Sequence, residues 1–491
     1  MDILQDISEE QRGALRDKLE KLLQPTRCRE TAFQQDETDG RSAFDSDFSR
    51  LAMSAPVRRL KDKTQVFPLP EYDFVRNRLT HSLEVMTIAR GLGLGVEKVL
   101  RQNGLYPTNE KLNQCKAMAE ILADVALVHD IGNPPFGHQI EKCIQTYFEK
   151  IPSPFIKQYY QQLTEEQQRD FCFIEGNSQG FRVLSHLGLA KDGYSFNLTL
   201  PVLATIVKYP NSSVEVNKEA ANHEQTKLGY LQSERDVYEY IHNTLSFESR
   251  SRHPLTYLLE AADDIAYLVC DVEDGFRNEN ISIENIQDSW RDAAANYEQI
   301  AEIINQLAEE NDEVKQQVLM QSLRIQLQSK MIIACTKCFC ANYAQILDGT
   351  YHKELVEEAC PSLQNFCKNL AKFNISDQLV KEKEQEGKEA VIYLLEGFLS
   401  AILLLQGKDG NETTFASPEY QLYSKISPNY RKVACEGDAK IPTEVYKMFL
   451  LATDYIFGMT DHFLIELAND HIIRDLIMRV QCKVDALVQG M

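Results

Sequence analysis

Residues 117–138 read AMAEILADVALVHDIGNPPFGH, an apolar stretch that ends in a Gly- and Pro-containing segment. Its apolar residues recur at intervals of three and four, the spacing of one helix face. The helix cannot continue through residues 132–135, Gly-Asn-Pro-Pro, because two prolines remove backbone donors and fix φ. The stretch therefore predicts a buried helix over residues 117–128 that ends at His129 and Asp130.

Helical periodicity also covers much of the remaining chain. It marks residues 82–92, 140–148, 255–272, 319–347, 391–405 and 445–457. A strand signal occurs only at residues 65–69, where Pro68 and Pro70 limit the length of any strand. We therefore expect an all-α fold.

The charge of the chain restricts its partners. Among 491 residues, 52 Lys and Arg face 73 Asp and Glu, which leaves a net charge of −21. Such a field repels polyanions, so an anionic substrate needs a local basic pocket or a metal ion. The composition argues against a general nucleic-acid coat.

The expected location is cytoplasmic, with no membrane partner. The N-terminus carries no basic, signal-like segment. The most apolar segment, residues 397–405, has about half the length that a bilayer-spanning helix needs. The twelve cysteines are therefore interpreted as reduced thiols, mostly in the core.

His129 and Asp130 form an unusual polar pair at the end of an apolar helix, where each needs a partner. The simpler interpretation is a helix cap or a hydrogen-bonded core histidine. His81, at the start of another helix, and Asp263, on a mostly apolar helix, extend the pair to two imidazoles and two carboxylates. Such a set suits Mg²⁺, Mn²⁺, Fe or Co and leaves coordination positions open for water and a phosphate oxygen.

The order of these four residues resembles the pattern of the HD-domain phosphohydrolases. Longer segments resemble the bacterial deoxyguanosine triphosphate triphosphohydrolases (dGTPases) within that superfamily. These segments are RLKDKTQVFPL (59–69), RLTHSLEV (78–85), HDIGNPPFGH (129–138), EGNSQG (175–180), EAADDI (260–265) and DYIFGMTD (454–461). The resemblance extends from about residue 50 to about residue 465.

The resemblance implies a helical HD-domain core with an additional C-terminal helical region. We expect a charged, loosely attached N-terminal arm over residues 1–50 and a catalytic core over residues 51–290. Residues 291–491 are expected to form a helical region packed on that core.

The resemblance also implies the metal ligands His81, His129, Asp130 and Asp263, with Mg²⁺ or Mn²⁺ as the ion and iron or cobalt as alternatives. Asp264 is the competing carboxylate. Asp263 is preferred because Tyr267 and Asp271 then follow at i+4 and i+8 on one helix face.

His138 and Glu141 match the positions of a catalytic dyad in the family. Their i, i+3 spacing lets the carboxylate orient the imidazole and raise its basicity. We expect His138 to act as the general acid or base at the α-phosphate and Glu141 to orient it. The alternative for Glu141 is a solvated carboxylate favoured by the helix dipole.

The remaining implied site residues are substrate contacts. Arg78, Lys208, Tyr209 and Lys227 match positions that hold the phosphates, and Gln65, Val66, Tyr267 and Asp271 match positions at the deoxyribose. A close contact at C2′ would exclude a ribose hydroxyl. Asn177 is expected near the metal, although Glu-Gly-Asn is equally consistent with a structural turn. Glu384 and Arg431 are candidates for reading the base.

These implications predict metal-dependent hydrolysis of dGTP, or of several dNTPs, to deoxynucleoside and inorganic triphosphate by water attack at the α-phosphorus. The alternatives are an HD phosphatase for nucleoside monophosphates or cyclic nucleotides, and a non-catalytic nucleotide-binding regulator. The resemblance also suggests a homo-oligomer, plausibly a hexamer, and single-stranded DNA as an effector.

Cys335-x-x-Cys338-x-Cys340 has the appearance of a zinc half-site. It lies in an apolar helical run with no fourth ligand at useful spacing. We expect these cysteines to be buried structural thiols.

Overall fold

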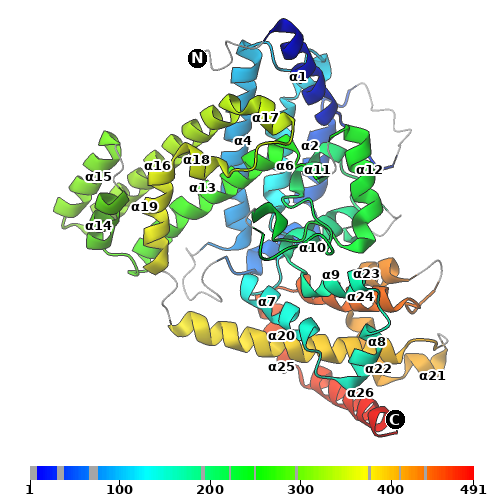
Figure 1. The fold of residues 1–491 in the computed structure, drawn as a ribbon. Coiled ribbons are helices and arrows are strands. Elements are labelled where there is room, and N and C mark those ends of the chain that lie inside the picture. Colours follow the sequence, from blue (N-terminus) through cyan, green and yellow to red (C-terminus); the bar gives the residue numbers. More distant parts are fainter. Residues whose placement is uncertain are drawn as a thin grey trace.

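The computed structural model describes residues 8–29, 38–65, 76–188, 194–220, 223–247, 250–293, 297–373, 378–408, 411–435 and 439–490 (Figure 1). Within these ranges the regular structure is helical, and β-pairing is limited to the isolated bridges Arg27–Thr199 and Thr64–Asn77. The all-α prediction is confirmed. Of the strand fragment expected at residues 65–69, only Gln65 lies within the described residues.

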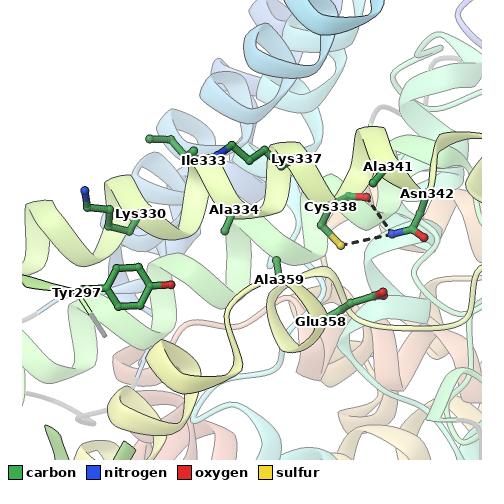
Figure 2. A pocket seen from close by; sticks show the side chains of 10 residues that line it. All are labelled: Tyr297, Lys330, Ile333, Ala334, Lys337, Cys338, Ala341, Asn342, Glu358 and Ala359. Carbon is green, nitrogen blue, oxygen red and sulfur yellow. Dashed lines mark hydrogen bonds between the residues drawn. The ribbon is translucent and has the colours of Figure 1, made fainter. Parts of the chain in front are cut away.

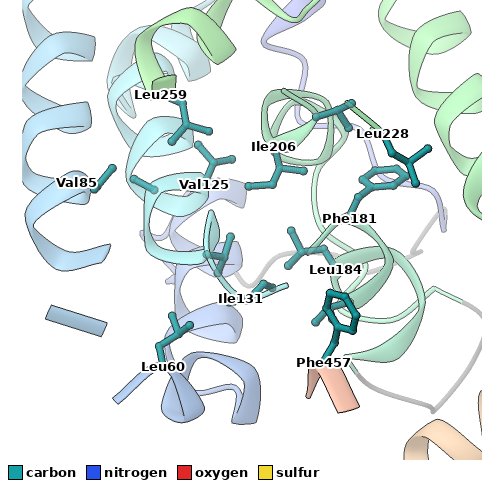
Figure 3. Packing of buried hydrophobic residues seen from close by; sticks show 14 of the residues in the cluster. Leu60, Val85, Val125, Ile131, Phe181, Leu184, Ile206, Leu228, Leu259 and Phe457 are labelled. Atoms are coloured by element: carbon teal, nitrogen blue, oxygen red, sulfur yellow. The ribbon is translucent and has the colours of Figure 1, made fainter. Parts of the chain in front are cut away.

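Three helices form the centre of the molecule: α4 (Arg78–Gln102), α6 (Ala117–Val128) and α13 (Pro254–Arg277). Helix α6 has the predicted bounds, and eleven of its twelve residues are buried. Figure 3 shows Val85 of α4, Val125 of α6 and Leu259 of α13 in the buried apolar cluster. The polar end of α6 is therefore fixed by a tightly packed apolar helix.

Local signals set the starts of the two flanking helices. Asn77 caps α4 by accepting a hydrogen bond from the backbone of Thr80, whose hydroxyl accepts one from the backbone of Asn77. His253 caps α13, and Pro254 occupies its first position, where the missing N–H costs nothing. His81 therefore lies in the first turn of α4.

The other helices of the N-terminal half surround this centre. They are α1 (Glu9–Leu22), α2 (Ala43–Ala52), α3 (Ala55–Arg59), η1 (Leu60–Asp62), α5 (Glu110–Gln114), α7 (His138–Glu149), α8 (Pro154–Tyr160), α9 (Glu165–Cys172), α10 (Gly176–Arg182), η2 (Val183–Leu187), α11 (Leu200–Ile206), η3 (His223–Gln225), η4 (Gln232–Glu234) and α12 (Arg235–Leu245).

The C-terminal half adds a second set of helices. They are α14 (Ile283–Ala293), α15 (Glu298–Glu309), α16 (Glu313–Ala341), α17 (Tyr343–Leu347), α18 (Leu355–Ala359), α19 (Pro361–Ala371), α20 (Gln378–Leu404), α21 (Glu412–Phe415), α22 (Pro418–Lys425), α23 (Pro428–Ala434), α24 (Val445–Phe457), α25 (Asp461–Asn469) and α26 (His471–Gln489). The predicted run 319–347 is divided into α16 and α17 at Asn342, whose side chain binds the carbonyl of Cys338 at 3.0 Å.

The long helix α20 crosses the lower part of the molecule beside α24, α25 and α26 (Figure 1). It also packs against α7, which follows the Pro-Pro turn. A buried ion network joins the two halves, because Arg182 of α10 contacts Glu234 of η4 in the N-terminal half and Asp454 of α24 in the C-terminal half. The C-terminal helices therefore pack on the elements that carry the turn.

The described part of the expected N-terminal arm contains two packed helices. Leu19 and Leu22 of α1 and Phe44 and Leu51 of α2 are buried in the common apolar cluster. Helix α2 packs on α6. These helices are therefore attached to the core, whereas the division at residues 50 and 290 stays a prediction.

No helix in the described ranges combines the length and the apolar character that crossing a membrane requires.

Candidate metal centre and active site

The proposed metal ligands come together from the three central helices. His81 lies at the start of α4, His129 and Asp130 at the end of α6, and Asp263 on α13. Ligand atoms of His81, His129 and Asp130 lie within 4.8 Å of one another. Oδ1 of Asp263 lies 3.1 Å from Nε2 of His81 and 3.4 Å from Nε2 of His129.

The imidazole of His129 is oriented toward this cluster. Its Nδ1 lies 2.8 Å from the carbonyl of Ala126, so Nδ1 carries the proton and Nε2 offers a lone pair. Nε2 is buried and makes no closer polar contact in the described chain than Asp263 at 3.4 Å. A buried nitrogen without a good hydrogen-bond partner is a feature expected of a metal ligand.

Both carboxylates are held in the ionised state by neighbouring cations. Burial would raise the pKa of Asp130, but neighbouring positive charge, first that of the Arg78 guanidinium, outweighs burial and lowers it. Arg78 Nη1 donates to Asp130 Oδ2 at 2.6 Å, and Asn133 Nδ2 donates to Oδ1 at 2.5 Å. Asp263 is likewise buried, but Lys208, at 2.7 Å from its Oδ2, helps to lower its pKa.

Asp263 rather than Asp264 contacts the imidazoles. Burial, reinforced by the charges of Glu260 and Asp263, raises the pKa of Asp264 to about 8. Two imidazoles and two carboxylates on three helices fit a divalent cation that keeps open positions. The donor set therefore suits the predicted metal centre.

The His138–Glu141 pair lies at the first turn of α7, after the Pro-Pro segment. Nδ1 of His138 lies 2.7 Å from Oε2 of Glu141, and the backbone N–H of Gly176 donates to Oε1 at 2.8 Å. The hydrogen bond and charge of Glu141 raise the pKa of His138. Burial opposes ionisation of Glu141, but the bond from His138 lowers its pKa. The His138 side chain is 72% exposed, so its imidazole is accessible to a ligand.

The turn that carries this pair depends on unusual backbone geometry. Phe136 and Gly137 have φ values of 57° and 63°, in the left-handed region. A Cβ at Gly137 would lie 2.8 Å from Nη2 of Arg78. At Gly132, a Cβ would lie 2.1 Å from the backbone of α10, so glycine permits the turn to pack directly on that helix.

Three of the predicted phosphate contacts are cations, of which two bind the carboxylates and one lies over the ring of the fourth contact, Tyr209. Arg78 and Lys208 bind Asp130 and Asp263, as described above. Nζ of Lys227 lies 5.1 Å from the ring centroid of Tyr209, which is buried. Burial would lower the pKa of Lys227, but Tyr209 and Glu175 outweigh it and raise the pKa.

The other predicted substrate residues have contacts and positions of their own. Nδ2 of Asn177 donates to Glu175 at 3.4 Å, and Oε1 of Gln65 is buried without a hydrogen-bond partner in the described chain. Tyr267 and Asp271 lie one and two turns beyond Asp263 on α13. Burial raises the pKa of Tyr267 to about 12, and a hydrogen bond to Asp271 adds to the rise. Val66 lies outside the described residues.

The two candidates for base recognition lie in the C-terminal half. Glu384 is on α20, which approaches the turn so closely that a Cβ at Gly387 would lie 2.8 Å from the ring of Phe136. Nε of Arg431 donates to the carbonyl of Ile426 at 3.1 Å, and its guanidinium lies over the ring of Tyr423. The Arg431 side chain is therefore held by Ile426 and Tyr423.

The sequence did not predict the buried contacts that hold the backbone of the Pro-Pro turn. Nζ of Lys63 donates to the carbonyls of Asn133 and Phe457 at 2.5 and 2.8 Å, and burial lowers its pKa to about 7. Asp461 accepts hydrogen bonds from the backbones of Thr64 and Phe136. Both residues lie in the quoted motif segments, which was the available signal, but spacing along the chain does not identify contacts.

The fold and this donor set define an HD-domain phosphohydrolase, and residues 78–173 match the HD-domain family. A deoxyguanosinetriphosphate triphosphohydrolase-like protein of Listeria monocytogenes is 36% identical over 91% of this chain and 97% of its own length. A similarly named Synechocystis protein is 32% identical over 86% of this chain and 91% of its own length. A deoxyguanosinetriphosphate triphosphohydrolase of Enterobacter is 30% identical over 85% and 91%, respectively. The chain belongs to the deoxyguanosinetriphosphate triphosphohydrolase family.

Proposed function

We propose that this protein hydrolyses a deoxynucleoside triphosphate, with dGTP as the first substrate to test, to a deoxynucleoside and inorganic triphosphate. The main supporting observation is that ligand atoms of His81, His129 and Asp130 cluster together, and that Asp263, bound by Lys208, lies beside both imidazoles. The His138–Glu141 pair follows the same turn. The names of the relatives support the substrate class.

The four cluster residues would hold Mg²⁺ or Mn²⁺, with iron or cobalt as alternatives. The ion would supply Lewis-acid polarisation of the α-phosphate and activation of the attacking water. The chain's own cations supply the remaining charge. In this structure Arg78 pairs with Asp130 and Lys208 pairs with Asp263. Lys227 is available for the phosphate tail because Tyr209 and Glu175 keep it protonated.

Proton transfer is assigned to His138. As water attacks the α-phosphorus, the bond from phosphorus to O5′ breaks and that oxygen needs a proton. The raised pKa of His138 keeps the imidazolium available as a general acid, and Glu141 stabilises that charge. Glu141 in turn is fixed by the backbone of Gly176.

Preference for deoxyribose is assigned to Gln65, Val66, Tyr267 and Asp271. Asp271 is buried, and burial raises its pKa to about 7. A close wall at C2′ would reject a ribose hydroxyl without any reading of the base. Asn177 is proposed as a polar contact near the metal, and base reading by Glu384 and Arg431 stays a prediction.

The deciding experiment is hydrolysis of dGTP in H₂¹⁸O with Mn²⁺ or Mg²⁺, followed by chromatography and mass spectrometry. We expect deoxyguanosine and triphosphate in equal amounts, with ¹⁸O in the triphosphate because water attacks phosphorus. Label in the deoxynucleoside would contradict attack at phosphorus. Accumulation of dGDP or dGMP would contradict release of intact triphosphate.

Variants of a phosphate-binding lysine and of a metal ligand distinguish the proposed activity from its rivals. A monophosphatase has no need for Lys227, so faster turnover of dGMP than of dGTP would favour that rival. A Lys227→Gln variant should raise KM for dGTP, whereas the exposed Lys98→Gln should not. A non-catalytic nucleotide binder should retain its function in His129→Ala.

Assembly and regulation rest on the family resemblance alone. We propose a homo-oligomer, with a hexamer as the first candidate, and single-stranded DNA as an effector. Sedimentation at two protein concentrations tests the assembly. Turnover with and without an oligodeoxynucleotide tests the effector, and an unchanged rate would contradict it.

A further inference from the structure

Arg76 connects the two central helices α4 and α13 through a set of ion pairs. Its Nε donates to both carboxylate oxygens of Glu84 on α4, at 2.9 and 3.1 Å. Its Nη2 donates to Oε2 of Glu273 on α13 at 2.6 Å, and its Nη1 donates to Asp274 of the same helix. The Arg76 side chain is 16% exposed, and Glu273 and Asp274 are buried. A guanidinium is a planar group with five N–H donors, so one side chain binds carboxylates of both helices at once.

A second polar contact between the same helices lies at the metal cluster. Nε2 of His81 on α4 lies 3.1 Å from Oδ1 of Asp263 on α13. Asp263 and Asp274 are about three helical turns apart on α13, so they lie on one face of it. The His81–Asp263 contact and the Arg76–Asp274 ion pair therefore connect α13 to the beginning of α4 at two separate points.

Tyr267 and Asp271 lie on α13 between these two points. They follow Asp263 at i+4 and i+8, on the face that also carries Asp274. Asp271 is buried, and Tyr267 shares a hydrogen bond with it. A helix that is bound on both sides of this stretch rotates or shifts only by breaking one of the contacts. The two residues assigned above to deoxyribose preference are therefore held in place relative to the metal cluster.

The same network contains a second cation whose contacts do not include α4. Nε of Arg324 on α16 lies 3.1 Å from Oε2 of Glu273, and its Nη1 donates to Gln328 of its own helix. The polar contacts of Arg324 within the described chain are therefore with α13 and α16. Its removal takes a positive charge from the network and leaves the connection to α4 in place, so Arg324 is a matched control for Arg76.

We propose that Arg76 is a positioning residue for sugar selection, which holds Tyr267 and Asp271 against the deoxyribose. This inference rests on the proposed hydrolysis of deoxynucleoside triphosphates. With Arg76 in place, the wall at C2′ stays close enough to reject a ribose hydroxyl. Without Arg76, the polar connection beyond Asp271 is lost, this part of α13 moves more freely, and a ribonucleotide is admitted.

The test compares dGTP with GTP as substrates of the wild-type chain, Arg76→Gln and Arg76→Lys. The values of kcat/KM for both nucleotides are measured on the same preparation, so the fraction of folded protein cancels in their ratio. We expect the dGTP-to-GTP ratio to fall by about 10-fold in Arg76→Gln. Arg76→Lys should lower the ratio too, because an ammonium group lacks the planar fork that binds both helices. A wild-type ratio in either folded variant would overturn the proposal.

Two further variants separate positioning from stability. Arg324→Gln should lower the melting temperature but keep the wild-type ratio, since the connection to α4 remains. Lys337 lies about three and a half turns beyond Arg324 on α16. There it lines a surface cavity of about 640 Å³, which Figure 2 shows, and Lys337→Gln should change neither quantity. A fall of the ratio in Arg324→Gln as large as that in Arg76→Gln would show a general effect of the ion network and overturn the proposal.

Failure of this inference is distinct from failure of the proposed function. A wild-type protein that does not hydrolyse dGTP with Mn²⁺ contradicts the proposed function. Binding then gives the readout, as the rise of the melting temperature with dGTP or GTP in the presence of Mn²⁺. The wild-type protein should respond more strongly to dGTP, and the Arg76 variants should lose this difference. Equal treatment of the two nucleotides by wild-type protein, in turnover or in binding, would overturn the inference.

Discussion

The carboxylate of Asp461 accepts a hydrogen bond of 3.0 Å from the backbone N–H of Phe136, although 325 positions separate the two residues. Its other oxygen accepts from the backbone N–H of Thr64 at 2.9 Å and from the Thr64 hydroxyl. Phe136 has a φ of 57° and directly precedes the segment that carries His138. The start of α25 therefore holds the backbone of the turn that precedes His138.

Replacement of Asp461 by asparagine should impair turnover more than stability. The amide keeps the shape but loses one accepting oxygen, so Phe136 or Thr64 is left facing an N–H group. A small displacement of His138 should then lower kcat by about 10- to 100-fold. Steady-state kinetics measures this, with Glu466→Gln, an exposed residue of the same helix, as the control. Equal kcat values in the two variants would contradict a role for this contact.

His129→Ala should abolish cation binding at the centre. In wild-type protein, Mn²⁺ is expected to raise the melting temperature, since an ion that binds the folded state stabilises it. The variant should show no such rise and no turnover. His138→Ala is the informative partner, because it should lose turnover by about 10²- to 10⁴-fold and keep the Mn²⁺-dependent rise. A retained rise in His129→Ala would exclude this imidazole as a ligand.

Glu141→Gln should shift the pH dependence of hydrolysis. Glu141 raises the pKa of His138, so removal of its charge lets that pKa fall. If imidazolium is the active form, activity is lost as pH rises through this pKa, and the alkaline limb should move to lower pH. The profile of kcat/KM measures the shift, and the solvent-exposed Glu149→Gln serves as the control. An unchanged alkaline limb would show that another group controls it.

Arg182→Ala should destabilise the whole fold. Arg182 is buried, and its guanidinium contacts Glu234 and Asp454 at 2.7 and 2.8 Å. Its removal leaves two carboxylates without their cation, a loss of about 3–5 kcal/mol for a broken buried pair. The urea midpoint should fall accordingly. Arg479→Ala removes an exposed i, i+4 pair with Asp475 and should change stability by about 0.5 kcal/mol or less.

Much of the architecture and part of the site follow from local sequence. Apolar spacing predicted α6 with its observed bounds, because a helix buries residues at intervals of three and four. The spacing of His138 and Glu141 predicted their contact, since residues three apart share a helix face. His129 and Asp130 lie between a buried helix and a Pro-containing turn, where each needs a polar partner. This local position identified the pair as a candidate site.

Tertiary packing decided the contacts between distant segments. Periodicity places Asp263 and Asp264 on one helix, but the crossing of α13 with α4 and α6 determines that Asp263 reaches His81 and His129. The contacts of Lys208 with Asp263 and of Asp461 with Phe136 likewise depend on how a loop residue and a distant helix come together in the fold. Helical spacing is a property of neighbouring residues, whereas these contacts require the packing of apolar faces that lie far apart in the chain.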